Sequence, residues 1–159
     1  MRQLHNNAVG LGWERLIKAQ KGTDSRKCRF DADAILTEFG GQTVCDIRHP
    51  SVYKQAQALG TTRSTMAMRL NTDNIDGGIV AVGNAPTALL EVIRLVREEG
   101  LRPALVVGVP VGFVKAVESK DELLTLEVPY ITAVGRKGGS NLAASVVNAL
   151  ILLALEETA

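Results

Sequence analysis

Three glycine-marked turns in the second half of the chain carry the residues best suited to bind a ligand. They read GNAPTAL at 83–89, GVPVGFV at 108–114 and GRKGGSNLA at 135–143, and each follows an apolar, strand-like stretch. The first and third turns open onto predicted helices, which Asn84 and Ser140 are expected to cap. The free N–H groups and positive dipole end of a helix start favour anions. Both turns are therefore candidate anion sites, with an ordinary capped helix start as the alternative.

The middle turn and one arginine complete the candidate site. The apolar side chains of 108–114 either line a pocket for an apolar ligand or fill the core beneath the loop. Arg63, flanked by hydroxyl residues, can hold a carboxylate through two hydrogen bonds, or pair with a nearby acid at the surface. Lys120 is expected to be a solvated surface charge, and His49 to cap a helix or lie at the surface. Together the residues predict a ligand with several carboxylates and a large apolar body.

Composition excludes several classes of function. The chain has 159 residues, of which 46% are hydrophobic and 4% aromatic, so one domain with an aliphatic core is expected. The net charge of +1 comes without a basic tract, which argues against nucleic acid as a partner. The N-terminus has no apolar signal-peptide core, and the apolar run at 142–155 is short for a membrane span. We expect a cytoplasmic protein with no membrane partner.

The order of predicted elements favours an α/β domain. From Thr43 onward, strands at 43–47, 78–82, 103–109 and 129–134 alternate with helical stretches, including one at 119–126 capped by Ser119. This alternation predicts three layers, with a mainly parallel sheet covered by helices on both faces. A helix is predicted at 11–20, and no strong strand is predicted before Thr43. We therefore divide the chain into a divergent N-terminal segment, 1–42, and an α/β domain, 43–159.

The chain resembles the precorrin-8X methylmutase family of cobalamin biosynthesis. The resemblance is carried by the three turns as a set together with the segments VCDIRHP, GTTRST, GIVAV, ESKDEL and VPYITAV. The resemblance covers about residues 41–150. It implies a flavodoxin-like fold that here lacks part of its N-terminal region, and a homodimer. It also implies an isomerase that needs no added cofactor or metal. The implied substrate is precorrin-8X or cobalt-precorrin-8, a tetrapyrrole with many acetate and propionate groups. A methyl group would move from C-11 to C-12, giving hydrogenobyrinate or its cobalt analogue.

The same resemblance implies a set of substrate-binding residues in four segments. They are Thr62, Arg63 and Ser64 in the TTRST segment, Asn84, Pro86 and Thr87 in the first turn, Gly112 and Phe113 in the second, and Gly138, Gly139 and Ser140 in the third.

The catalytic acid is the residue that the sequence does not supply clearly. The family has a histidine in an R-x-x-H motif near its N-terminus, suited to protonating the ring system. Here His5 follows an arginine at a similar spacing in a different sequence context, and the family's histidine motif is not found in residues 1–40. A catalytically inactive tetrapyrrole-binding homologue is therefore the alternative function. A less favoured alternative is an unrelated α/β module that binds a nucleotide or another small acid.

Overall fold

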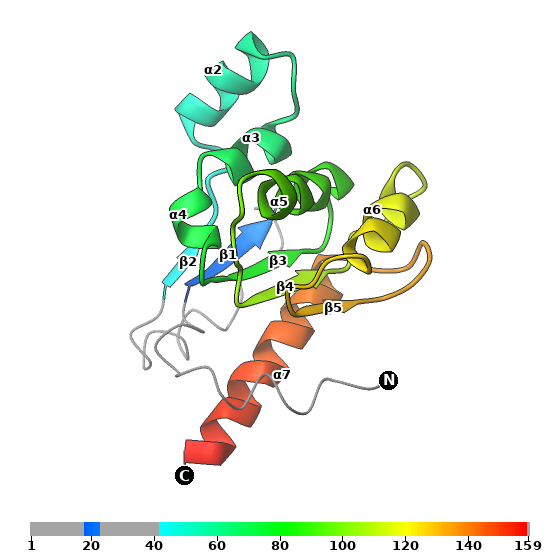
Figure 1. Ribbon diagram of the computed structural model, residues 1–159. Coiled ribbons are helices and arrows are strands. Elements are labelled where there is room, and N and C mark those ends of the chain that lie inside the picture. The colour runs from blue at the N-terminus through cyan, green and yellow to red at the C-terminus, as the bar shows by residue number, and fades with distance from the viewer. Residues whose placement is uncertain (1–17, 23–41, 159) are drawn as a thin grey trace.

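Within the described residues the sheet has five strands, and every neighbouring pair is parallel (Figure 1). The computed structural model describes residues 18–22 and 42–158 of the chain. Its strand order is β2-β1-β3-β4-β5, which is the flavodoxin order. The strands are β1 (Lys18–Gly22), β2 (Gln42–Val44), β3 (Ile79–Val82), β4 (Leu105–Gly108) and β5 (Tyr130–Thr132).

Helices cover both faces of this sheet, as the sequence predicts. The helices are α2 (Pro50–Ala58), α3 (Arg63–Arg69), α4 (Thr72–Ile75), α5 (Pro86–Glu98), α6 (Ala116–Leu123) and α7 (Ser140–Thr158). In Figure 1, α3, α4, α5 and α6 lie on one side of the sheet, and α7 crosses the other side. The three-layer α/β arrangement is therefore confirmed.

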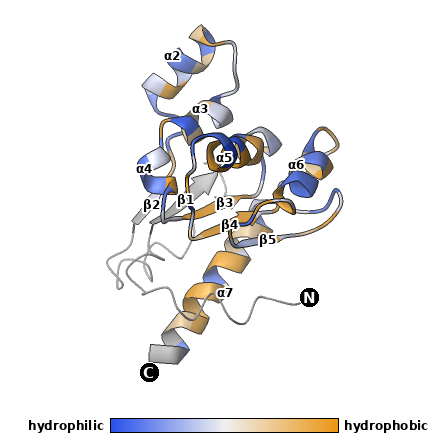
Figure 2. Ribbon diagram, viewed as in Figure 1, coloured by the Kyte–Doolittle hydropathy of each residue, from blue (hydrophilic) through white to orange (hydrophobic). Residues whose placement is uncertain are grey.

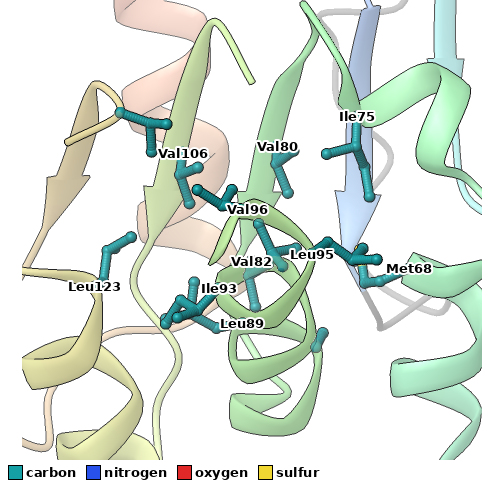
Figure 3. Close-up of a cluster of buried hydrophobic side chains, with 13 residues drawn as sticks. Met68, Ile75, Val80, Val82, Leu89, Ile93, Leu95, Val96, Val106 and Leu123 are labelled. Carbon is teal, nitrogen blue, oxygen red and sulfur yellow. The ribbon is translucent and has the colours of Figure 1, made fainter. Parts of the chain in front are cut away.

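Two aliphatic clusters hold the layers together. Val80 and Val82 of β3 point toward α5, where they join the larger cluster with residues such as Leu89 and Ile93 (Figure 3). Ile79 and the other alternate side chains of β3 face α7 instead. This alternation follows from the pleat of a strand, which sends successive side chains to opposite faces. A continuous apolar strand is thus buried on both sides, as expected for a parallel sheet.

The N-terminal part of the fold differs from the prediction. Residues 18–20 belong to β1, so the helix predicted at 11–20 is wrong there, and its first part lies outside the described residues. Strand β1 pairs with both neighbours, with Ala19 opposite Ile79 and Lys18 opposite Gln42. The segment KAQKG lacks the alternation of apolar and polar residues that would predict a strand. Strand β1 forms because its backbone pairs with strands on both sides, and the local sequence does not reveal this pairing.

The cap predicted at His49 is confirmed, and Thr62 caps a second helix. The His49 side chain accepts a hydrogen bond from the Ser51 N–H at the start of α2, and Thr62 accepts one from the Thr65 N–H at the start of α3. Helix α2 also has Pro50 in its first turn, and Gly60 just beyond its end has a φ of 61°. These starts follow ordinary capping rules.

Three other predicted caps are wrong. Ala85, not Asn84, is the residue before α5, and its side chain makes no capping hydrogen bond. Ser119 lies inside α6, where its hydroxyl donates to the Ala116 carbonyl, and Lys115 precedes the helix. Ser140 is the first helical residue of α7 rather than the residue before it. In each case the helix starts one or more residues away from the side chain that could have capped it.

Helix α7 is the most apolar helix of the fold (Figure 2). Its buried residues Ala143 and Val147 pack against β3 and β4, whereas Leu152 and Leu153 near its end are exposed. The apolar run at 142–155 therefore belongs to a helix that packs against the core. None of the described helices has the length and apolar character needed to cross a membrane.

Candidate functional site

The three glycine-marked turns lie against one another at the carboxyl ends of β3, β4 and β5. The Gly139 N–H donates to the Val109 carbonyl over 2.9 Å, and the Gly112 N–H to the Arg136 carbonyl over 3.5 Å. The second and third turns are therefore joined by their backbones. The carboxyl edge of a parallel sheet is where ligands bind in folds of this class, and β3 flanks the point where the strand order reverses.

Close backbone contact explains two of the glycines. A Cβ at Gly83 would lie 2.5 Å from the Cα of Ser140, and a Cβ at Gly138 would lie 2.2 Å from the Val109 carbonyl oxygen. No larger residue fits at either position without moving a neighbouring backbone. The first turn thus packs on the third, and the third on the second. We call the segments 83–87, 109–113 and 135–140 the interlocked turns.

The start of α3 is tied to the start of α5. The Thr62 hydroxyl donates to the Thr87 hydroxyl over 3.1 Å, and the Thr65 hydroxyl to the Thr87 carbonyl over 3.4 Å. Thr62 also receives the Thr65 N–H over 3.1 Å. Arg63 directly follows Thr62, and it is exposed. The structure therefore brings the TTRST segment beside the first of the interlocked turns.

The exposed side chains at this edge combine apolar and cationic character. Phe113 is 86% exposed, and the Arg136 guanidinium lies over its ring, 5.6 Å from the centroid. Val114 and Val134 are also exposed, whereas Val109 is buried in the core cluster against α7. The core interpretation of the middle turn is right for Val109, whereas the later side chains face solvent, and their role in lining a pocket stays a prediction. A cation stacked on an aromatic ring offers a ligand both charge and a flat apolar surface.

Lys120 is not the solvated charge that the sequence suggests. Only 1% of it is exposed, and its Nζ donates a hydrogen bond to the Lys137 carbonyl over 2.8 Å. Burial lowers the pKa of Lys120, and the nearby Asp121 carboxylate opposes this only in part. Helical spacing is the missed signal, because Ala116, Lys120 and Leu123 share the buried face of α6.

A buried acid that sequence reasoning missed connects α3 with α5. Glu91 is 5% exposed and accepts from Arg69 through both of its oxygens, over 3.0 and 3.1 Å. It also accepts from Arg94, with the shorter contact at 2.6 Å. Burial by itself would raise the pKa of Glu91, but the hydrogen bonds from the two arginines outweigh it and lower the pKa. The α3–α5 junction is thus held by an internally neutralised cluster.

The histidines leave the catalytic acid unassigned. His49 is exposed, and its Nδ1 lies 2.6 Å from the Ser51 hydroxyl and also accepts the Ser51 N–H, so it serves the start of α2. His5 lies outside the described residues. What the described edge offers is positive charge, helix starts and an exposed ring, which suit binding of an anionic, partly apolar molecule.

Comparison with known proteins identifies the family. The sequence model of precorrin-8X methylmutase matches residues 28–153. The chain belongs to the precorrin-8X methylmutase family. The match includes all four segments of the candidate site and begins upstream of β2. The resemblance predicted from the turns is therefore confirmed.

The relatives share substantial sequence identity with this chain. A cobalt-precorrin-8 methylmutase of Methanocaldococcus jannaschii is 53% identical over 115 residues, which are 72% of this chain and 55% of the relative. One from Priestia megaterium is 50% identical over 119 residues, 75% of this chain and 53% of the relative. The chain thus spans about half the length of these curated relatives.

Solved structures agree on the fold. The precorrin-8X methylmutase of Thermus thermophilus superposes with a TM-score of 0.81 and 38% identity, covering 96% of this chain and 74% of that one. A precorrin-8X methylmutase related protein superposes with a TM-score of 0.70 and 34% identity, covering 76% of this chain and 63% of that one.

Proposed function

We propose that this chain acts as a precorrin-8X methylmutase, an isomerase of cobalamin biosynthesis. The reaction would move a methyl group from C-11 to C-12 of the tetrapyrrole and yield hydrogenobyrinate or its cobalt analogue. The observation that carries the proposal is the family match over the interlocked turns, whose exposed groups suit a large polycarboxylate. Relatives named as cobalt-precorrin-8 and as precorrin-8X methylmutases both match, so either form of the substrate is included.

The proposed site uses the residues inferred from the sequence. Arg63 would hold one peripheral carboxylate, with Thr62 and Ser64 beside it, and the helix start at Pro86 and Thr87 would face another. Around the third turn, the N–H groups of Gly138 and Ser140 would receive a further carboxylate, while Gly139, whose N–H is bonded to the Val109 carbonyl, would hold the turn in place. Asn84, Gly112 and Phe113 complete the set, with the exposed phenylalanine ring placed to contact a face of the macrocycle.

The chemistry of the shift requires control of charge in the ring system. Protonation of the ring eases migration of the methyl group, and a histidine is suited to supply that proton near neutral pH. We assign this role to none of the described residues. The catalytic acid stays unassigned, with His5 as the candidate that the sequence offers. The division of the chain at residue 43 also remains a prediction. A homodimer in the cytoplasm is likewise part of the proposal.

Turnover is the direct test. The purified chain is incubated with precorrin-8X, and separately with cobalt-precorrin-8, while the absorbance change on product formation is followed. We expect conversion of at least one substrate. Tight binding of hydrogenobyrinate without conversion of either would favour the alternative, a binding protein that has lost the reaction. Absence of both conversion and binding would overturn the proposal.

Arg63 offers a sharper test of the site. Arg63→Ala should weaken hydrogenobyrinate binding by about tenfold, the usual effect of losing one charged hydrogen-bonding partner. The matched control is Arg102→Ala, because Arg102 is also exposed but precedes β4, at the opposite edge of the sheet. Equal affinities for the two variants would remove Arg63 from the site.

A further inference from the structure

Lys120 is a buried lysine whose amine contacts a backbone carbonyl, not a carboxylate, within the described part of the chain. Among the residues that the structure describes, no carboxylate forms a salt bridge with its Nζ. An unpaired buried ammonium is costly, so a folded protein rarely keeps one without a use. The contact that Nζ does make is to the Lys137 carbonyl, at the middle of the third interlocked turn.

That contact fixes the orientation of one peptide group. Every described peptide bond is trans, so the Gly138 N–H points opposite to the Lys137 carbonyl in the same plane. Because the carbonyl is turned toward the buried amine, the N–H is directed away from it. No acceptor within the described part of the chain meets this N–H. The peptide therefore presents a donor on the side remote from Lys120.

The surroundings hold this peptide in place on both sides. The Arg136 carbonyl accepts from the Gly112 N–H, and the Gly139 N–H donates to the Val109 carbonyl, so the turn is fixed before and after residues 137–138. Gly138 itself lies against the Val109 carbonyl. Asp121 on α6 is the charged group that acts on the Lys120 amine, and the charged side chains of the turn, Arg136 and Lys137, are exposed. The turn is thus net cationic, and a carboxylate bound there would supply the missing negative charge.

We propose that Lys120 is a positioning residue for carboxylate binding at the third interlocked turn. Its amine turns the 137–138 peptide so that the Gly138 N–H faces the ligand, and its charge adds to the attraction for an anion. The inference rests on the proposed function for the identity of the ligand, a peripheral carboxylate of the tetrapyrrole. Lys120 itself touches the turn and not the ligand.

The test compares three variants. Lys120→Met removes the charge and the donor with little change in volume, Lys120→Arg keeps both, and Lys54→Met makes the first change at an exposed site on α2. Thermal unfolding checks folding, and titration with hydrogenobyrinate measures affinity. We expect folded Lys120→Met to bind about tenfold more weakly, Lys120→Arg to recover most of the affinity, and Lys54→Met to match the wild type. In turnover, Lys120→Met should raise KM more than it lowers kcat.

A folded Lys120→Met variant with wild-type affinity would overturn the proposal. If that variant does not fold, amide NMR of the wild-type chain during titration with citrate decides. Shifts concentrated at Gly138 and Gly139 support the proposal, and unshifted signals at both positions overturn it. Citrate also separates this inference from the proposed function. Binding of citrate at the turn without binding of hydrogenobyrinate would reject the tetrapyrrole as the ligand and keep the turn as a carboxylate site.

Discussion

The interlocked turns and the α3–α5 junction are neighbouring regions that are held together in opposite ways. The turns touch backbone to backbone, with Gly83 against Ser140 and Gly138 against Val109. The junction is held by side chains, with the Glu91 carboxylate between two arginines. In one region the charged side chains remain exposed, and in the other they satisfy one another.

The difference indicates where a ligand can bind. At the junction the buried carboxylate and its arginines already form good hydrogen bonds, so an incoming anion would gain little there. At the turns Arg136 and Lys137 are exposed, and among the described residues Lys120 is the charged side chain that packs beneath this edge. Positioning by backbone contact leaves side chains free for recognition, whereas positioning by ion pairs uses them.

The largest expected effect comes from adding one methyl group to the interlocked turns. Gly138→Ala should lower the free energy of unfolding by about 3 kcal/mol, because the new Cβ overlaps a backbone oxygen that cannot move easily. Gly60→Ala is the control: its φ of +61° is strained for alanine, but nothing lies within 4 Å. It should cost about 1 kcal/mol. Urea unfolding followed by circular dichroism measures both, and equal losses would mean that the turns are not held by close packing.

At the junction, we expect a smaller loss from removal of the charge on Glu91. Glu91→Gln should lower the free energy of unfolding by about 2 kcal/mol at pH 7, less than for a fully buried pair because both arginines are partly exposed. The measurement is again urea unfolding, with Glu98→Gln, an exposed partner of Arg94, as the control. An equal loss of unfolding free energy in both variants would mean that the buried Glu91 carboxylate does not hold the α3–α5 junction together.

The stabilising effect of the Glu91 carboxylate should depend on pH. The pKa of Glu91 is lowered in the folded chain from its ordinary value of 4.5. Its contribution to stability is therefore complete above that value and is lost as the pH falls through the folded-state pKa. The difference between the wild type and Glu91→Gln should narrow in acid. A difference that stays constant across this range would contradict the role of the ionised carboxylate.

Removal of one hydroxyl group should have the smallest effect. Thr62→Ala deletes the cap of α3 and the hydrogen bond to Thr87, and should cost about 1 kcal/mol. Thr62→Ser keeps the hydroxyl and should retain most of the stability. Thr61→Ala, at a neighbouring hydroxyl with no hydrogen bond in the described part of the chain, serves as the control. If Thr62→Ala also weakens hydrogenobyrinate binding, the link between α3 and the turns supports the site as well as the fold.

Much of the fold after Thr43 could be predicted because its signals are local. Apolar strands such as 78–82 are followed by helices whose starts and ends are marked by Pro86 and Gly100, and the structure places β3 and α5 there. Strand β1 could not be predicted, because KAQKG becomes a strand through its partners on both sides. The family resemblance also rests on local signals, because glycines that close contacts require form a fixed pattern in the sequence.

The candidate site was predicted less completely. The turns and Arg63 are visible as glycines, helix starts and charge, but Lys120 and Glu91 look like ordinary surface residues in polar stretches. Their burial depends on which helix face meets the sheet or the neighbouring helix. The burial of Lys120 could have been predicted from its helical spacing to Ala116 and Leu123. The burial of Glu91 could not, because it depends on the position of Arg69 on another helix.

The position of β1 also has a consequence for the order in which the chain folds. Strands β3, β4 and β5 are joined in sequence by α5 and α6, so each pairs with a partner close in the chain. Strand β1 must instead reach β3 from a distant part of the chain, which closes a long loop and is slow. We expect the β3–β5 half to form first and to expose an open strand edge until β1 arrives. During that interval, chains at high concentration would pair with one another, so refolding should be most efficient when the protein is dilute.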